Sequence, residues 1–146
     1  MPSSGDLLDA NVWLALAAGA HVHHRRAEAY WKKEAAPVTA FCRVTQLAFL
    51  RHLTNRTIMG DHVLTPTSAW IKRAEFLALP EVRFLAEPSG LDQQIGKFCQ
   101  MGRTSPNLWT DAYLASFAKC DGLRLVTFDH GFAKFTGLEL LILDPV

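Results

Sequence analysis

The strongest constraint on the fold of this sequence is a repeated succession of a short apolar run, an aspartate and a helical pattern. Leu7-Leu8 ends at Asp9 and passes directly into a helical segment, and the apolar run of residues 123–127 ends just before Asp129. Such runs are typical of strands in a parallel sheet, where helices cover both faces. The sequence therefore predicts an α/β fold, a three-layer αβα sandwich around a mostly parallel sheet of about four to five strands.

Apolar periodicity and breaker residues place the remaining elements. Further strands are expected over residues 37–42, 82–86 and 138–143, and helices before Pro37, over residues 45–54, 68–79 and 91–101, and from residue 107 to Gly122. Residues 55–67 contain Gly60 and Pro66, and they are predicted to form a loop. Strands alternate with helices along the whole chain, as in a parallel sheet.

Length and composition favour one domain over residues 1–146. The chain has 146 residues, of which 49% are hydrophobic, enough for a sizeable core. Its 15 Lys and Arg nearly balance 14 Asp and Glu, so any site for a polyanion must be local. The three cysteines are widely spaced, which is typical of buried thiols in a reducing cytosol rather than of disulfides or zinc sites.

The amino-terminal apolar stretch of residues 12–20 does not have the features of a signal peptide. It lacks a basic leader and follows two acids, Asp6 and Asp9. No apolar run is long enough to span a bilayer. We therefore expect a cytoplasmic protein without a membrane partner.

Three aspartates are expected to meet at one edge of the sheet. A helix from Asp111 to Cys120 travels about 14 Å at about 1.5 Å per residue. The strand back to Asp129 covers about 20 Å at about 3.3 Å per residue. Asp9 also follows a strand, and the carboxyl ends of parallel strands converge on one crevice. Each acid also has a structural explanation, Asp111 as a first-turn charge and Asp129 as a turn residue.

Acids gathered in a crevice repel one another and are costly to bury without a cation. A site with only oxygen ligands favours Mg²⁺ or Mn²⁺ over zinc. The histidines at positions 21, 23 and 24 match no zinc spacing, and we expect them at a helix start or on the surface.

The ordered motifs resemble a known family. The motifs are Leu-Leu-Asp9-Ala-Asn11-Val, Asn107-x-x-Thr110-Asp111-Ala-x-Leu-Ala and Thr127-x-Asp129-x-x-Phe132. Together they resemble the PIN domain, specifically the VapC toxins of prokaryotic VapBC toxin–antitoxin pairs, over essentially the whole chain. The resemblance implies an endoribonuclease that depends on Mg²⁺ or Mn²⁺, forms a homodimer and is held inactive by a VapB antitoxin.

The resemblance also implies the roles of particular residues. Asp9, Asp111 and Asp129 correspond to the metal-binding, catalytic acids of the family. The supporting positions beside them are Asn11, Gln46, Asn107 and Thr127. Residue type alone, rather than the resemblance, makes Arg51 and Arg103 candidates for contacts with RNA phosphates, with a solvated face as the alternative. In the same way, Trp13, Trp31 and Phe49 are candidates for contacts with the antitoxin, with a place in the core as the alternative.

Gln46 departs from the family pattern, which has an acid, usually glutamate, at this position. A glutamine offers a carbonyl oxygen but no charge, so the site holds one negative charge fewer for a divalent ion. We expect weaker metal binding, or one ion where an intact site holds two.

Other functions fit the residues less well. Gln46 is the main support for a catalytically weak or inactive PIN-like domain that binds RNA or protein. A phosphatase of the haloacid dehalogenase type needs a second acid two residues after Asp9, where this chain has Asn11. A purely structural domain would carry aspartates at strand ends by chance, without the ordered motifs.

Overall fold

A computed structural model describes residues 4–101 and 103–144. Its five strands form one sheet in the order β3-β2-β1-β4-β5, and every neighbouring pair is parallel. The strands are β1 (Gly5–Leu8), β2 (Val38–Phe41), β3 (Val82–Phe84), β4 (Arg124–Thr127) and β5 (Leu140–Ile142). The predicted parallel α/β sandwich is thus confirmed.

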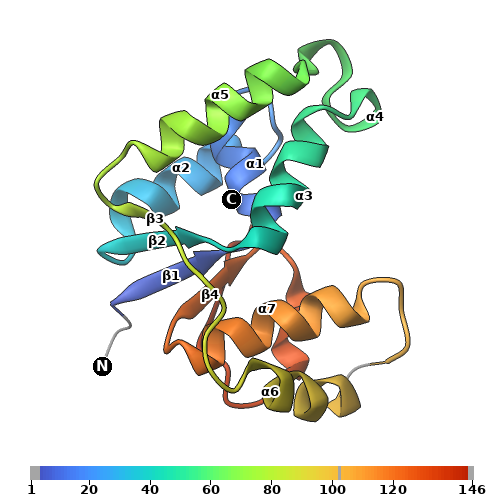
Figure 1. The fold of residues 1–146 in the computed structure, drawn as a ribbon. Coiled ribbons are helices and arrows are strands. Elements are labelled where there is room, and N and C mark those ends of the chain that lie inside the picture. The colour runs from blue at the N-terminus through green and yellow to red at the C-terminus, as the bar shows by residue number, and fades with distance from the viewer. Residues whose placement is uncertain (1–3, 102, 145–146) are drawn as a thin grey trace.

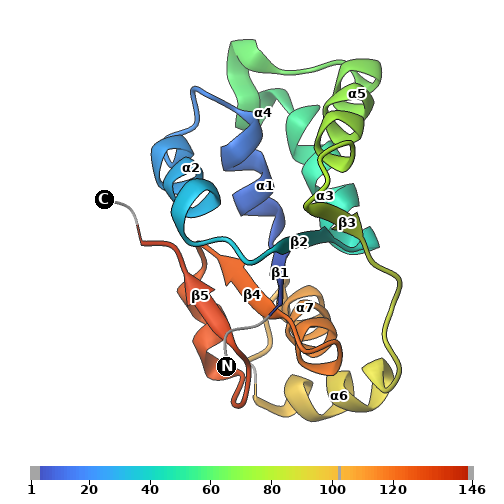
Figure 2. The same ribbon diagram turned by 90° about the vertical axis from the view of Figure 1, so that its left-hand side faces the viewer.

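Helices cover both faces of the sheet (Figures 1 and 2). One layer contains α1 (Ala10–Ala17), α2 (His24–Lys33), α3 (Arg43–Leu53), α4 (Arg56–Met59) and α5 (Pro66–Leu77), and the other contains α6 (Leu91–Phe98) and α7 (Leu108–Cys120). The 3-10 turns are η1 (Gly60–His62), η2 (Cys99–Met101) and η3 (His130–Lys134). None of the described helices has the length and hydrophobicity needed to cross a membrane.

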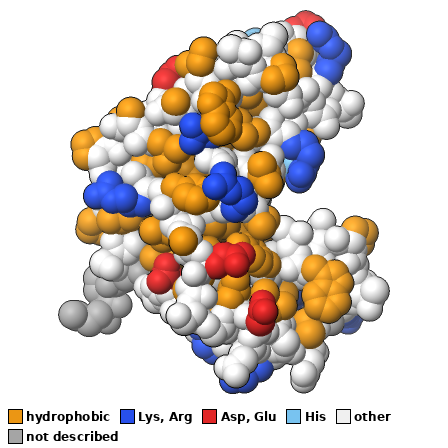
Figure 3. Space-filling view, viewed as in Figure 1, with side chains coloured by type: hydrophobic (Ala, Val, Ile, Leu, Met, Phe, Trp, Pro, Cys, Tyr) orange, Lys and Arg blue, Asp and Glu red, His pale blue; other side chains and the backbone are white. Residues whose placement is uncertain are grey.

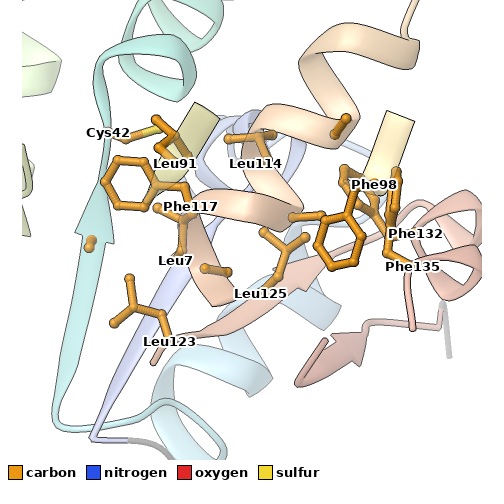
Figure 4. Packing of buried hydrophobic residues seen from close by; sticks show 14 residues of the cluster. Leu7, Cys42, Leu91, Phe98, Leu114, Phe117, Leu123, Leu125, Phe132 and Phe135 are labelled. Carbon is orange, nitrogen blue, oxygen red and sulfur yellow. The ribbon is translucent and has the colours of Figure 1, made fainter. Parts of the chain in front are cut away.

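Alternate residues of each central strand enter two separate hydrophobic clusters, because successive side chains of a strand point to opposite faces. In β1, Leu7 belongs to the cluster beneath α6 and α7, whereas Leu8 belongs to the cluster beneath α1, α3 and α5. Leu125 and Val126 of β4 divide in the same way. Figure 4 shows the first cluster, where Leu7 and Leu125 lie near Phe117 of α7.

An aromatic group fills the second cluster. The ring of Trp13 stacks on Phe41 with centroids 3.8 Å apart, and Phe76 meets Trp13 edge-on at 5.1 Å. Trp13 and Phe49 are 0% exposed. The expectation that these two side chains contact an antitoxin is therefore wrong, because apolar rings of this size are most stable in the core.

The segment of residues 55–67 is more ordered than the predicted loop. It contains α4 and η1, and α5 begins at Pro66, before the expected start. The side chain of Asn55 caps α4 by accepting a hydrogen bond of 2.9 Å from the Thr57 N–H. Thr65 caps α5 through the Ser68 N–H at 3.2 Å, and Pro66 occupies the first turn, where no N–H is required.

A buried acid ties β1 to its surroundings. Asp6 is 0% exposed and accepts two hydrogen bonds of 2.9 Å from the guanidinium of Arg124 on β4. The same carboxylate accepts from the Tyr30 hydroxyl at 2.5 Å and from the Ala36 N–H at 3.0 Å. Burial and the charge of Asp6 raise the pKa of Tyr30, which therefore stays a hydroxyl donor. Four donors thus compensate the burial of one carboxylate.

We expect Asp6→Ala to lower the free energy of unfolding by about 3–5 kcal/mol, because Arg124 would lose its buried partner. Urea unfolding followed by circular dichroism measures this. The matched control is Glu28→Ala, which removes a carboxylate from exposed ion pairs with His24 and Lys32 and should cost at most about 1 kcal/mol. Equal losses in the two variants would contradict the structural role of Asp6.

Candidate active site

Asp9 lies where β1 ends and α1 begins. Its Oδ1 accepts a hydrogen bond of 2.7 Å from the Ala10 N–H, and its Oδ2 accepts one of 2.8 Å from the Thr127 hydroxyl. Burial raises the pKa of the Asp9 carboxyl, these two hydrogen bonds lower it, and the charge of Asp129 raises it. The carboxylate is therefore oriented from two sides but remains electrostatically unfavourable.

Thr127 connects Asp9 to the second acid. Its hydroxyl donates to Asp9 and accepts a hydrogen bond of 3.0 Å from the Asp129 N–H. The Asp129 carboxylate in turn caps η3 by accepting from the Gly131 N–H at 2.8 Å. Thr127 is 0% exposed, whereas Asp129 lies at the surface. One buried hydroxyl therefore connects Asp9, after β1, with Asp129, after β4, through hydrogen bonds to the Asp9 carboxylate and the Asp129 backbone.

Asp111 lies in the first turn of α7 and is half-buried. Burial, together with the charges of Asp129 and Asp9, raises its pKa to about 6, and the nearby cation Lys134 partly opposes this shift. The three predicted acids therefore lie close enough to act on one another. Within residues 4–101 and 103–144, no three His, Cys, Asp or Glu side chains form a ready-made metal cluster.

The two asparagines have minor contacts. The Asn11 side-chain oxygen lies 3.5 Å from the Phe128 N–H, a long hydrogen bond toward the loop that carries Asp129. Asn107 precedes α7, and its backbone carbonyl accepts the Asp111 N–H at 2.9 Å. Asn11 thus lies beside the acids, whereas Asn107 is exposed and supports Asp111 through the backbone.

Gln46 is buried in the second turn of α3, with 2% of its surface exposed. Its carbonyl oxygen accepts a hydrogen bond of 2.6 Å from the guanidinium of Arg43. The oxygen that could have bound a metal ion therefore already has a cationic partner. The sequence analysis did not identify Arg43, although the spacing of three residues on one helix places it beside Gln46.

Arg51 and Arg103, the predicted phosphate contacts, are both exposed. In the part of the chain that the structure describes, neither forms an ion pair, and neither contributes to the pKa shifts of Asp9 and Asp111. Figure 3 shows a hollow on the right-hand side of the molecule, between the part over α3 to α5 and the part over α6 and α7.

Charge repulsion among the acids has a consequence for stability. The folded pKa of Asp111, about 6, exceeds its ordinary value of 3.8, so stability falls as pH rises between these values and the penalty is complete above pH 6. We expect Asp111→Asn to raise the Tm of the metal-free protein at pH 7.5. Solvent screens this half-buried group, so the gain should be about 1 kcal/mol, or about 2–4 °C.

Differential scanning calorimetry with EDTA measures this gain. The difference between variant and wild type should shrink as the pH approaches 4. The control Asp92→Asn changes an exposed acid in the first turn of α6, and it should give no increase. A lower Tm for Asp111→Asn at pH 7.5 would contradict the repulsion described above.

Comparison with known proteins identifies the family. The model of the PIN domain family matches residues 7–138. Ribonuclease VapC41 of Mycobacterium tuberculosis is 44% identical over 142 residues, which cover 94% of this chain and 97% of the relative. Ribonuclease VapC38 of the same species is 34% identical over 86% of this chain and 85% of its own length.

Solved structures show the same fold at low sequence identity. VapBC2 from Rickettsia felis, bound to a DNA fragment of its promoter, superimposes with a TM-score of 0.67 and 16% identity over 96% of this chain and 99% of that one. Mycobacterium tuberculosis VapC20, described as a toxin that cleaves the sarcin-ricin loop, has a TM-score of 0.67 and 18% identity over 92% and 97%. The chain therefore belongs to the PIN domain family, with the VapC ribonucleases as its relatives.

Proposed function

We propose that this protein is a metal-dependent endoribonuclease that hydrolyses RNA phosphodiester bonds as the toxin of a type II toxin–antitoxin pair. The observation that carries the proposal is the electrostatic coupling of Asp9, Asp111 and Asp129 at the carboxyl ends of β1 and β4 and the start of α7. The names of the VapC relatives support the same activity.

The chemistry of these donors fits a divalent cation. The charges of Asp129 and Asp9 raise the pKa of Asp111, and a positive charge would relieve this repulsion. Oxygen ligands favour Mg²⁺ or Mn²⁺. Asp9, Asp111 and Asp129 would hold the ion. When bound, the ion polarises a phosphate and lowers the pKa of an attacking water, so no side-chain nucleophile is needed.

The residues around the acids prepare them for this role. The Ala10 N–H and the Thr127 hydroxyl fix both oxygens of Asp9, and the Gly131 N–H fixes Oδ1 of Asp129. Preorganised ligands need less reorganisation when an ion and a substrate bind. Lys134 lies near Asp111 and would place a positive charge beside the phosphate of the substrate.

The partners also belong to the proposal. Several structural neighbours are toxin–antitoxin complexes, among them VapBC-1 of Haemophilus influenzae. On this basis we propose a VapB-type antitoxin that blocks the site, a homodimer, and action on RNA in the prokaryotic cytoplasm. The alternative is a PIN-like module that binds RNA or protein without cutting. Two facts favour it: position 46 holds a glutamine instead of a fourth acid, and the oxygen of that glutamine already accepts a hydrogen bond from Arg43.

Cleavage tests these two functions directly. We expect the purified protein to cut RNA with Mg²⁺ or Mn²⁺ and to stop with EDTA, because the acids need the ion. Asp111→Asn should reduce the rate by at least about 100-fold, whereas Asp92→Asn, on the exposed side of α6, should retain it. Gel analysis of labelled RNA measures both rates. Equal cleavage by Asp111→Asn would refute the mechanism, and binding without cleavage would favour the alternative.

The hydroxyl of Thr127 should control metal affinity. Thr127→Val keeps the shape of the side chain but removes the hydrogen bonds to Asp9 and Asp129, so Mn²⁺ affinity measured by calorimetry should fall about 10–100-fold. Thr39→Val is the matched control, because Thr39 is also buried in the sheet and its hydroxyl has no partner among the described residues. Unchanged affinity in Thr127→Val would show that the hydroxyl is dispensable.

A further inference from the structure

We propose that Arg43, held in place by Gln46 and Phe84, binds the RNA phosphate that neighbours the scissile one. This inference rests on the proposed action on RNA and assigns a binding role to residues outside the acid cluster.

Arg43 lies at the carboxyl edge of the sheet. It is the first residue of α3 and follows Cys42, which directly succeeds β2. The register pairs Phe41 at the end of β2 with Phe84 at the end of β3. β2 also pairs with β1, whose carboxyl end leads into Asp9. Arg43 therefore lies on the same edge as the acids, on the β3 side of them.

Two contacts hold the guanidinium. Its Nη1 donates to the buried oxygen of Gln46 at 2.6 Å, and its central carbon lies 4.4 Å from the centroid of the Phe84 ring. An arginine that is stacked on a ring and hydrogen-bonded to a buried amide loses less conformational freedom when it binds a ligand. Arg43 is thus preorganised although it is exposed.

The charge of Arg43 is not neutralised by a neighbouring acid. A guanidinium has five N–H donors, and Gln46 takes only one of them. Other arginines of the chain pair with carboxylates, as Arg124 does with Asp6 and Arg26 with Glu34. No ion pair involves Arg43 within residues 4–101 and 103–144. The ligand that fits the remaining donors is an anion, and a phosphate matches their fork geometry.

The position of Arg43 indicates a neighbouring phosphate rather than the scissile one. The guanidinium of Arg43 stacks on the ring of Phe84, the last residue of β3. β3 lies two strand spacings from β1, a distance of about 10 Å. The charges that act on Asp111 are those of Asp129, Asp9 and Lys134. An RNA strand lying across the edge would thus meet Lys134, the acids and Arg43 in that order.

This arrangement explains why a neutral residue suits position 46. A glutamate there would pair with Arg43 inside the protein and neutralise it, as Asp6 does with Arg124. Glutamine fixes the guanidinium through the same kind of contact but leaves its charge available to RNA. Compared with the family pattern, the chain thus has a neutral residue in place of an acid at position 46, and beside it a cation that can bind phosphate.

RNA binding measured without cleavage tests the proposal. Fluorescence anisotropy would follow a labelled single-stranded oligoribonucleotide in EDTA, with Asp111→Asn as the common background so that no RNA is cut. Arg43→Ala should weaken binding about 10-fold and reduce the slope of log K against log salt by about 0.7, the value for one phosphate contact on a single strand. Gln46→Glu should lower the slope similarly, and Arg43→Lys should retain it.

The matched control is Arg73→Ala, because the Arg73 guanidinium lies 3.7 Å from the ring centroid of Trp70 on α5. It should leave the slope unchanged. An unchanged slope in Arg43→Ala, or an equal loss in Arg73→Ala, overturns the phosphate site. If binding depends on Arg43 but the wild-type protein cuts no RNA with Mg²⁺ or Mn²⁺, the proposed nuclease activity is wrong and the phosphate site is supported. A protein that binds no RNA overturns both.

Discussion

The pairing of β1 with β4 is the interaction on which the rest of the structure depends. Their register places Leu8 beside Val126, so that Asp9 and Thr127 meet at the carboxyl ends of the two strands. At the amino ends, Asp6 and Arg124 form a buried ion pair. Hydrogen bonds between side chains thus lock both ends of one strand pair. The contact of Asp6 with Arg124 stabilises the fold, whereas the contact of Asp9 with Thr127 orients an acid of the candidate site.

The acids in these two contacts, Asp6 and Asp9, differ in how far the protein compensates their charge. Asp6 has a cation and two further donors, so its charge is compensated within the protein. Asp9 and Asp111 have raised pKa values because burial and neighbouring acids act on them without equal compensation. A carboxylate whose charge is left uncompensated is available to an external cation. This contrast distinguishes Asp6, an acid with a structural role, from Asp9, an acid of the candidate site, at opposite ends of β1.

Much of the fold and of the acid cluster could be predicted from the sequence, because apolar strands and helices alternate and each acid lies at an element boundary. The role of Asp6 could not be predicted, since an acid inside a short strand shows no sign of a partner that lies 118 positions later. The contact of Arg43 with Gln46 could not be predicted, because the sequence does not show that the side chain of Gln46 is buried and so available to fix the guanidinium. The four-residue helix α4 is too short for a periodic pattern.

The sequence separation within the β1–β4 pair also determines when the site can form during synthesis. The contacts between Asp6 and Arg124 and between Asp9 and Thr127 each join residues 118 positions apart. β1 lies between β2 and β4, so one of its edges stays unpaired until β4 leaves the ribosome. A nascent chain therefore has no complete set of acids until Asp129 has been synthesised, and any activity of the site begins only after that point.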